Sequence, residues 1–321
     1  PFVTLPTVNY EWKEGLGQLT AEGMNQEYKM GMQFRQKYIE QTHLLPESYE
    51  PGTVYVRSTD YDRTLMSAQS LLIGLYPPGT GPNTSEPPTS ALPHAFQPIP
   101  VFSAPRQVDD VIVQDLSPKE HQELMEQYVY STKEWQQKNE ELKDKYSRWS
   151  NLSGLPINNL VDLLKLGDTL IVYRAHNAPM PSGLSEEDIQ TIIEANDWAL
   201  AAQDRPQQVG IAYDSKLMLH ISEYLKNGIK PNSKLKYVLL SAHDTTLSRT
   251  LSFLAAPLNN APGYASNVNF SLYETSSSSY IVKVTYNGKP VVIPACGGSS
   301  CELQQFIKLV KNTSKMPQPA G

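Results

Sequence analysis

The feature that most constrains the fold is KYVLLSAHDTT, in which the uninterrupted apolar run Tyr237 to Leu240 ends in small and charged residues. A run of this length and composition is typical of a strand that helices cover on both faces. The residues after it carry Leu247, Leu251 and Leu254 at helical spacing, so a helix is predicted directly after the strand. Buried strands that alternate with amphipathic helices predict an α/β fold with a mostly parallel central sheet.

Other segments fit the same pattern. A helix is predicted over 19–39 with Thr20 as its N-cap, followed by a strand over 53–59 and a helix over 63–76. Residues 77–100 are rich in Pro, Gly and Ser and predict a long surface loop, whereas Asn287-Gly288 predicts a turn between two antiparallel strands. Phe2 to Leu5 is predicted to be a further short, buried strand, with a turn or loop starting at Pro6.

The chain is interpreted as one α/β core with an insertion. Residues 1–100 and 205–321 are assigned to the α/β catalytic core, and residues 101–204 to a mostly helical insertion or cap domain. The last helix of the insertion is predicted to begin at a capping box, Ser185-x-x-Asp188.

Charge and hydropathy argue against nucleic acid and membranes as partners. The formal net charge of −6 disfavours nucleic acid and anionic membrane surfaces. No apolar run approaches the roughly 18 residues needed to span a membrane, and no leader pattern is present, so we expect a cytoplasmic protein or the mature form of an exported one.

The only two cysteines, Cys296 and Cys301, lie in ACGGSSC, where glycines and serines allow a tight loop. A disulfide is favoured, because a zinc site would need further ligands and the six histidines show no paired spacing that would supply them. Two free thiols in a reducing cytosol remain the alternative.

Two predicted strands end in residues suited to bind an anion, at the sheet edge where parallel α/β folds place their ligands. Arg57 ends the first, and its planar guanidinium matches phosphate or carboxylate. His243-Asp244 ends the second and pairs an imidazole with a potential general acid. The plain alternatives are a surface arginine at position 57 and an aspartate that only caps a helix. Arg63 is interpreted mainly as structural, as a residue that helps to start the next helix.

Four stretches of the sequence carry a family resemblance: FVTL, VYVRSTDYDRTLMSAQSLL, LLSAHDTTLS and the closing P-x-C…C. Together they resemble the histidine acid phosphatases, branch 2 of the histidine phosphatase superfamily. The match runs nearly end to end. The resemblance implies an α/β fold with a smaller helical domain, in the manner of phosphoglycerate mutase. It also implies two-step hydrolysis of phosphomonoesters through a phosphohistidine, with inorganic phosphate as product and with no metal or cofactor.

By position in the motifs, the resemblance makes Asp244 the general acid, and Arg57 and His243 the groups that bind phosphate. It further implies a periplasmic or secreted protein, a small-molecule phosphomonoester as partner with no nucleic acid and no membrane, and a possible homodimer. An acidic pH optimum is expected, because the carboxyl group must be protonated to act as an acid.

One departure from the family pattern concerns the nucleophile. The resemblance places an R-H-G-x-R-x-P loop, with the nucleophilic histidine, directly after FVTL, but here Leu5 is followed by Pro6 and no R-H-G occurs in the sequence. Either the polypeptide carries a segment that this sequence lacks, or the loop is deleted. With the loop the function is an acid phosphatase, with a phytase-like preference as a variant; without it the chain is a non-catalytic phosphate-binding pseudoenzyme.

Overall fold

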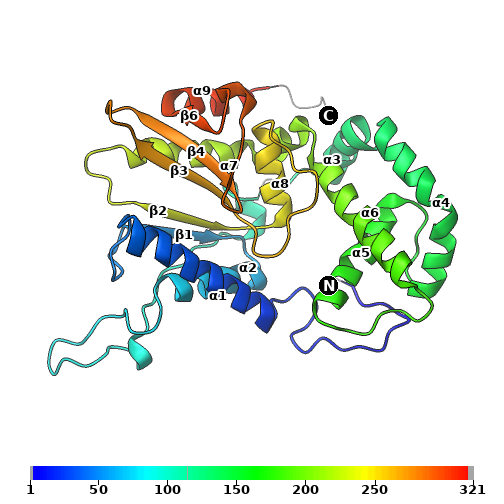
Figure 1. The fold of residues 1–321 in the computed structure, drawn as a ribbon, viewed down its shortest axis with the longest axis horizontal. Helices are drawn as coiled ribbons and strands as arrows, with labels where there is room; N and C mark the ends of the chain where they lie inside the picture. The colour runs from blue at the N-terminus through cyan, green and yellow to red at the C-terminus, as the bar shows by residue number, and fades with distance from the viewer. Residues whose placement is uncertain (1–2, 114, 317–321) are drawn as a thin grey trace.

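The computed structural model describes residues 3–113 and 115–316, which form an α/β part and a helical part (Figure 1). The α/β class is confirmed. The α/β part is built from α1 (Ala21–Arg35), β1 (Val54–Ser58), α2 (Asp62–Leu75), α7 (Gln207–Gly228), β2 (Tyr237–Ser241), α8 (Asp244–Phe253), β3 (Val268–Glu274), β4 (Tyr280–Tyr286), β5 (Lys289–Pro290), β6 (Ser300–Glu302) and α9 (Leu303–Thr313). The expected strand–helix alternation around β1 and β2 is therefore observed.

The strands form two sheets. β1 and β2 pair in parallel, with Arg57 opposite Leu240 and Ser58 opposite Ser241. β3 and β4 pair antiparallel, and β5 and β6 add to β4. Among the described residues no ladder joins β2 to β3, although the two strands run near each other in Figure 1. The parallel part of the sheet is thus smaller than the sequence predicts.

The predicted strand at Phe2 to Leu5 is wrong for the residues that the structure describes, and Phe2 lies outside them. Val3 to Leu5 belong to no strand. Leu5 is instead buried in the apolar cluster of the helical part, together with Trp12 and Tyr173. A turn follows at once, in which the Val8 amide donates to the Leu5 carbonyl. A short apolar run has no periodicity that distinguishes a strand from another kind of buried segment. The apolar side chains can therefore be buried equally well without a strand, as Leu5 is in the helical cluster.

The helical part contains α3 (Pro118–Met125), α4 (Lys133–Ser153), α5 (Leu160–Ala175) and α6 (Glu186–Asp204). The capping box at the start of α6 is confirmed, with the Ser185 side chain accepting from the Asp188 amide. Apolar side chains from these helices and from the N-terminal segment share one core, in which Trp149 and Tyr173 are fully buried. The domain boundaries at 100 and 205 stay a prediction.

Helices α1 and α2 pack unusually closely at two glycines. A β-carbon on Gly31 would lie 2.0 Å from the Leu71 carbonyl oxygen, and one on Gly74 would lie 2.2 Å from the Tyr28 carbonyl oxygen. Because both positions need the absence of a side chain, this packing fixes α2 on α1 and with it the loop that enters α2.

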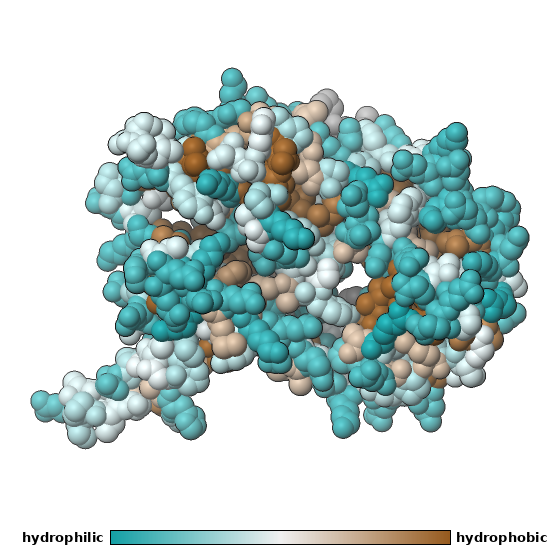
Figure 2. All heavy atoms as spheres, viewed as in Figure 1, coloured by the Kyte–Doolittle hydropathy of each residue, from teal (hydrophilic) through white to brown (hydrophobic). Residues whose placement is uncertain are grey.

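The loop over 77–100 leaves the body of the molecule as predicted. It forms the arm at the lower left of Figure 1, and Figure 2 shows that mainly hydrophilic and neutral residues cover it. Among the residues described, one isolated β-bridge in this arm joins Asn83 to Ser90, and backbone hydrogen bonds such as that from the Thr84 amide to the Thr89 carbonyl cross it as well.

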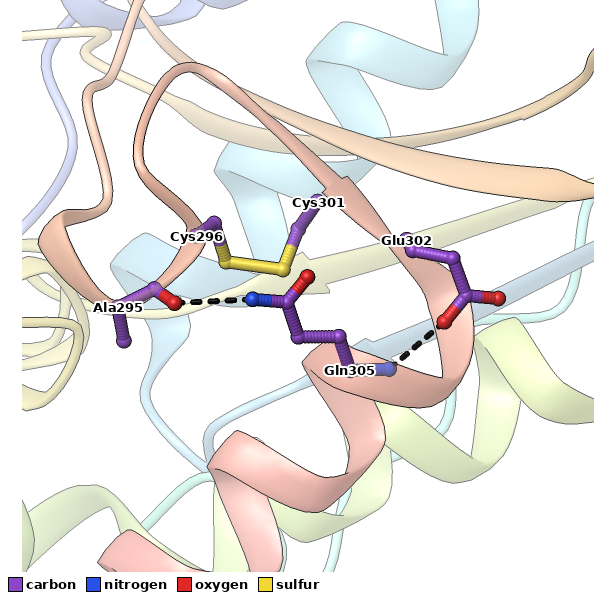
Figure 3. Close-up of a disulfide and its surroundings, with 5 residues drawn as sticks. All are labelled: Ala295, Cys296, Cys301, Glu302 and Gln305. Atoms are coloured by element: carbon purple, nitrogen blue, oxygen red, sulfur yellow. Dashed lines mark hydrogen bonds between the residues drawn. A yellow bond between two sulfur atoms is a disulfide. The ribbon is translucent and has the colours of Figure 1, made fainter.

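The disulfide is confirmed, with Cys296 and Cys301 joined by an S–S bond of 2.09 Å (Figure 3). It closes a short loop before α9, where the Glu302 side chain caps the helix by accepting from the Gln305 amide. The Gln305 side chain donates to the Ala295 carbonyl across the same loop. In the described part of the chain, no helix has the length and apolar character needed to cross a bilayer.

Candidate active site

A cavity lies beyond the carboxyl ends of the paired strands β1 and β2, next to the start of α8. Both strands are parallel, so the loops that follow them open on the same side of the sheet. The cavity is lined by Tyr61, Arg106, Ile112, Val113, Asp115, Tyr213, Asp214, His243, Thr245, Thr246 and Arg249. Three of these residues, His243, Thr245 and Thr246, belong to the first turn of α8, where free N–H groups favour an anion.

His243 occupies the N-cap position of α8, with an extended backbone at φ −127° and ψ 161°. Its Nε2 atom lies 3.2 Å from Oγ1 of Thr59, a buried residue that directly follows β1. Burial, the guanidinium of Arg63 and, more weakly, that of Arg106 lower the pKa of the His243 imidazole. The imidazole therefore favours its neutral form more than an exposed histidine does.

Asp244 is the first residue of α8 and is exposed. One carboxylate oxygen accepts from the Thr245 amide at 2.8 Å. Asp244 is not among the residues that line the cavity with His243. Its charge nevertheless acts on both neighbours: it raises the pKa of the His243 imidazole, against the effects of burial and Arg63, and it adds to the raised pKa of Asp168 in α5, which is due mainly to burial.

Arg57 does not line the cavity. Its Nη2 atom pairs with Oδ1 of Asp109 at 2.9 Å, and the Asp109 side chain has no exposed surface. The same Asp109 oxygen accepts from the amides of Val111 and Ile112. In this structure Arg57 therefore neutralises a buried carboxylate that organises residues 109–112.

Arg63 has a stronger electrostatic effect on His243 than Arg57 has. It is the charged residue that most strongly lowers the pKa of the imidazole. Its guanidinium carbon lies 4.6 Å from the centre of the Tyr61 ring, and Tyr61 lines the cavity. The sequence-based interpretation of Arg63 as a helix starter missed this position. The available signal was its place at the start of the helix that is predicted to follow the strand over 53–59.

A buried polar network supports the far wall of the cavity. Nε of Arg249 donates to Asp204 at 2.7 Å, and the Arg249 guanidinium stacks on the Tyr213 ring at 3.8 Å. Burial raises the pKa of Asp214 to about 7, and Thr250 donates a hydrogen bond to its carboxyl at 2.7 Å. These groups lie on α6, α7 and α8, and no sequence pattern indicated that the three helices would bring them together.

The cavity and its surroundings show no ligand set for a metal. Among residues 3–113 and 115–316, no group of three or more histidine, cysteine or acidic side chains is placed to hold a metal ion. The charged groups that the cavity presents are guanidinium, imidazole and carboxyl groups, which suits an anionic ligand bound by hydrogen bonds.

Comparisons with known proteins agree with this geometry. The model of the histidine phosphatase superfamily (branch 2) matches residues 4–287. Human lysosomal acid phosphatase is 30% identical over 332 residues, covering 97% of this chain and 74% of that protein. Bovine prostatic acid phosphatase is 31% identical over 316 residues, covering 95% of this chain and 79% of that protein.

Solved structures show the same fold. A Klebsiella phytase superimposes with a TM-score of 0.70 at 16% identity, covering 97% of this chain and 88% of that one. The apo form of Hafnia alvei phytase gives a TM-score of 0.68 at 16% identity and covers 97% and 91% of the two chains.

Proposed function

The chain belongs to the histidine phosphatase superfamily (branch 2), and from this premise we propose that it is an acid phosphatase that hydrolyses small phosphomonoesters. The observation that carries the proposal is the position of His243. It stands at the helix terminus of α8, bonded to the end of the neighbouring strand and close to the guanidinium of Arg63. An imidazole, a guanidinium and free helix N–H groups together stabilise the charge of a phosphoryl group.

In this proposal His243 and Arg63 hold the phosphoryl oxygens, and Asp244 protonates the leaving oxygen. Asp244 is exposed and adjacent to His243, so it can reach a leaving group that extends towards the helical part. The assignment of Arg57 to phosphate binding, made from the sequence, competes with its pairing to Asp109. Sulfate binding by variants of Arg57 and Arg63 decides between them.

The nucleophile needs a separate test. His243 is the only histidine among the described residues that lines the cavity, and it occupies the phosphate-binding position in this proposal. The second candidate function, a phosphate-binding protein without turnover, is favoured by one observation: Leu5 is buried in the helical part and is followed directly by Pro6. No strand end near the cavity carries a further histidine in the part of the chain described.

The deciding experiment combines mass and activity on the purified protein. An intact mass above the 35.9 kDa of this sequence, with the extra peptide mapping between Leu5 and Pro6, together with turnover of an aryl phosphate, supports the enzyme. Turnover should then vanish in His243→Ala and fall in Asp244→Asn. Equal mass with phosphate binding but no turnover supports the second candidate, and turnover retained in His243→Ala overturns the role of His243.

The proposal also covers the cellular compartment and the oligomeric state of the protein. The Cys296–Cys301 disulfide favours an oxidising compartment, such as the periplasm or the outside of the cell, because cytosolic thiols are kept reduced. Self-association into a homodimer, which the family resemblance implies, is tested by light scattering of the purified chain.

A further inference from the structure

Tyr61 lies between β1 and α2 and contacts the imidazole of His243. The two ring centres are 5.3 Å apart and the ring planes are 85° to each other, an edge-to-face arrangement. Tyr61 is also the N-cap residue of α2, but its side chain makes no capping hydrogen bond. Tyr61 lines the cavity.

Two guanidinium groups hold the phenol ring in place. The guanidinium carbon of Arg63 lies 4.6 Å from the ring centre, and that of Arg106 lies 5.8 Å from it. Nη1 of Arg106 also donates to the Tyr61 hydroxyl at 2.6 Å. Arg106 is itself fixed by Asp115, which accepts from Nε at 3.0 Å and from Nη2 at 3.2 Å. The ring is thus held by charged partners from two separate segments, the first turn of α2 and the segment around Arg106.

These contacts differ from ordinary core packing. Tyr61 is half-buried and belongs to none of the apolar clusters of the described residues. Its contacts are instead cations, a hydroxyl partner and the imidazole. The Thr59 contact holds the Nε2 atom of His243, and a hydrogen bond at one atom does not by itself set the plane of the ring. The Tyr61 ring, which stands perpendicular to the imidazole, is a second contact that restricts this plane.

We propose that Tyr61 is a positioning residue that sets the plane of the His243 imidazole, and that the Arg106–Asp115 pair holds Tyr61 in place through its hydroxyl. The proposal rests on the anion-binding role of His243 given above. The ring of Tyr61 acts on His243 directly, whereas the hydroxyl acts only through Arg106. The two parts of the side chain therefore have separable effects.

The test compares Tyr61→Leu, which removes the ring, with Tyr61→Phe, which keeps the ring and removes only the hydroxyl. The titration of the His243 Cε1 proton is followed by NMR in the free protein, and sulfate affinity is measured by calorimetry. In Tyr61→Leu we expect the pKa of His243 to rise towards its ordinary value, because the imidazole loses a covering ring. We expect sulfate affinity to fall about tenfold, by analogy with the lower end of the losses seen when a group that orients a metal-binding side chain is removed.

Tyr61→Phe loses the hydrogen bond from Arg106, but its ring can keep the contact with the Arg63 guanidinium. We therefore expect only a small change, with a His243 titration close to wild type and a sulfate affinity within about twofold of it. An unchanged His243 titration in Tyr61→Leu overturns the proposal, and so does an equal change in both variants. The NMR titration needs no bound anion. A wild-type protein that fails to bind sulfate would therefore refute the proposed function, while the titration would still decide the role of Tyr61.

Discussion

The Nε2 atom of His243 lies 3.2 Å from Oγ1 of Thr59, so a single side-chain contact joins the residues that follow two paired strands. Thr59 is fully buried, and its hydroxyl also lies 2.9 Å from the hydroxyl of Thr64 in α2. The imidazole is therefore bonded to a group whose own position is fixed by the helix behind it. This relationship makes the orientation of His243 depend on β1 and α2 as well as on α8.

Replacing Thr59 by valine should weaken anion binding. Valine keeps the shape of threonine but cannot bond Nε2 of His243, which costs about 1 kcal/mol for a hydrogen bond of this kind, or about fivefold in affinity. Calorimetric titration with sulfate measures the change. Thr59→Ser is the matched control, since it keeps the hydroxyl, and it should bind within about twofold of wild type. A Thr59→Val protein that binds sulfate as tightly as wild type would contradict this role.

Sulfate affinity should rise as pH falls from 8 to 5. Burial and nearby guanidinium groups, Arg63 first, lower the pKa of the free His243 imidazole, and a bound dianion favours its charged form, so binding takes up a proton. The increase is at most tenfold per pH unit, and sulfate keeps its charge throughout this range. His243→Gln should remove most of the dependence. Asp214→Asn is measured alongside, because Asp214 lines the same cavity and its pKa is about 7.

The sequence predicted those features that depend on local pattern. The apolar run before His243 predicts β2, and the strand pattern before the loop into α2 predicts β1. His243 was therefore correctly placed after the end of a strand. Arg57 was selected because it ends a strand, but residues alternate across a strand, and its side chain points to Asp109 and not into the cavity. Arg106 and Asp115 lie in a segment without regular pattern, so only the folded chain brings them to Tyr61.

The two arginines should differ in what their loss changes. Arg57→Met leaves the carboxylate of Asp109 buried and unpaired, which should lower the free energy of unfolding by about 3–5 kcal/mol. The double variant Arg57→Met/Asp109→Asn removes that charge and should recover most of the stability. Urea unfolding measures both.

Sulfate binding then decides which arginine faces the anion. Arg63→Met should bind at least about tenfold more weakly than wild type, since a charge-assisted contact contributes roughly 1.5–3 kcal/mol. The Arg57→Met/Asp109→Asn protein should bind as wild type does. Loss of sulfate binding in that double variant would restore the sequence-based assignment of phosphate binding to Arg57.

The free energy of unfolding should fall as pH rises from about 4 to 8, because burial favours the protonated form of the Asp214 carboxyl. Asp214 is only 3% exposed, and burial raises its pKa to about 7. Between its ordinary pKa and about pH 7 the folded protein binds more protons than the unfolded chain, so the stabilisation is complete at low pH and is lost as pH rises through that range. The loss from this one group is of the order of 2–4 kcal/mol.

Asp214→Asn isolates this contribution. The asparagine can still accept the hydrogen bond from Thr250 but does not titrate, so the free energy of unfolding in urea should differ less between pH 5 and pH 8 than in wild type. Some dependence should persist, because burial also raises the pKa of Asp204 to about 6. If wild type and Asp214→Asn lose the same free energy between the two pH values, the carboxyl of Asp214 is already ionised in the folded protein, and its place in the cavity wall must then be stabilised by Arg249.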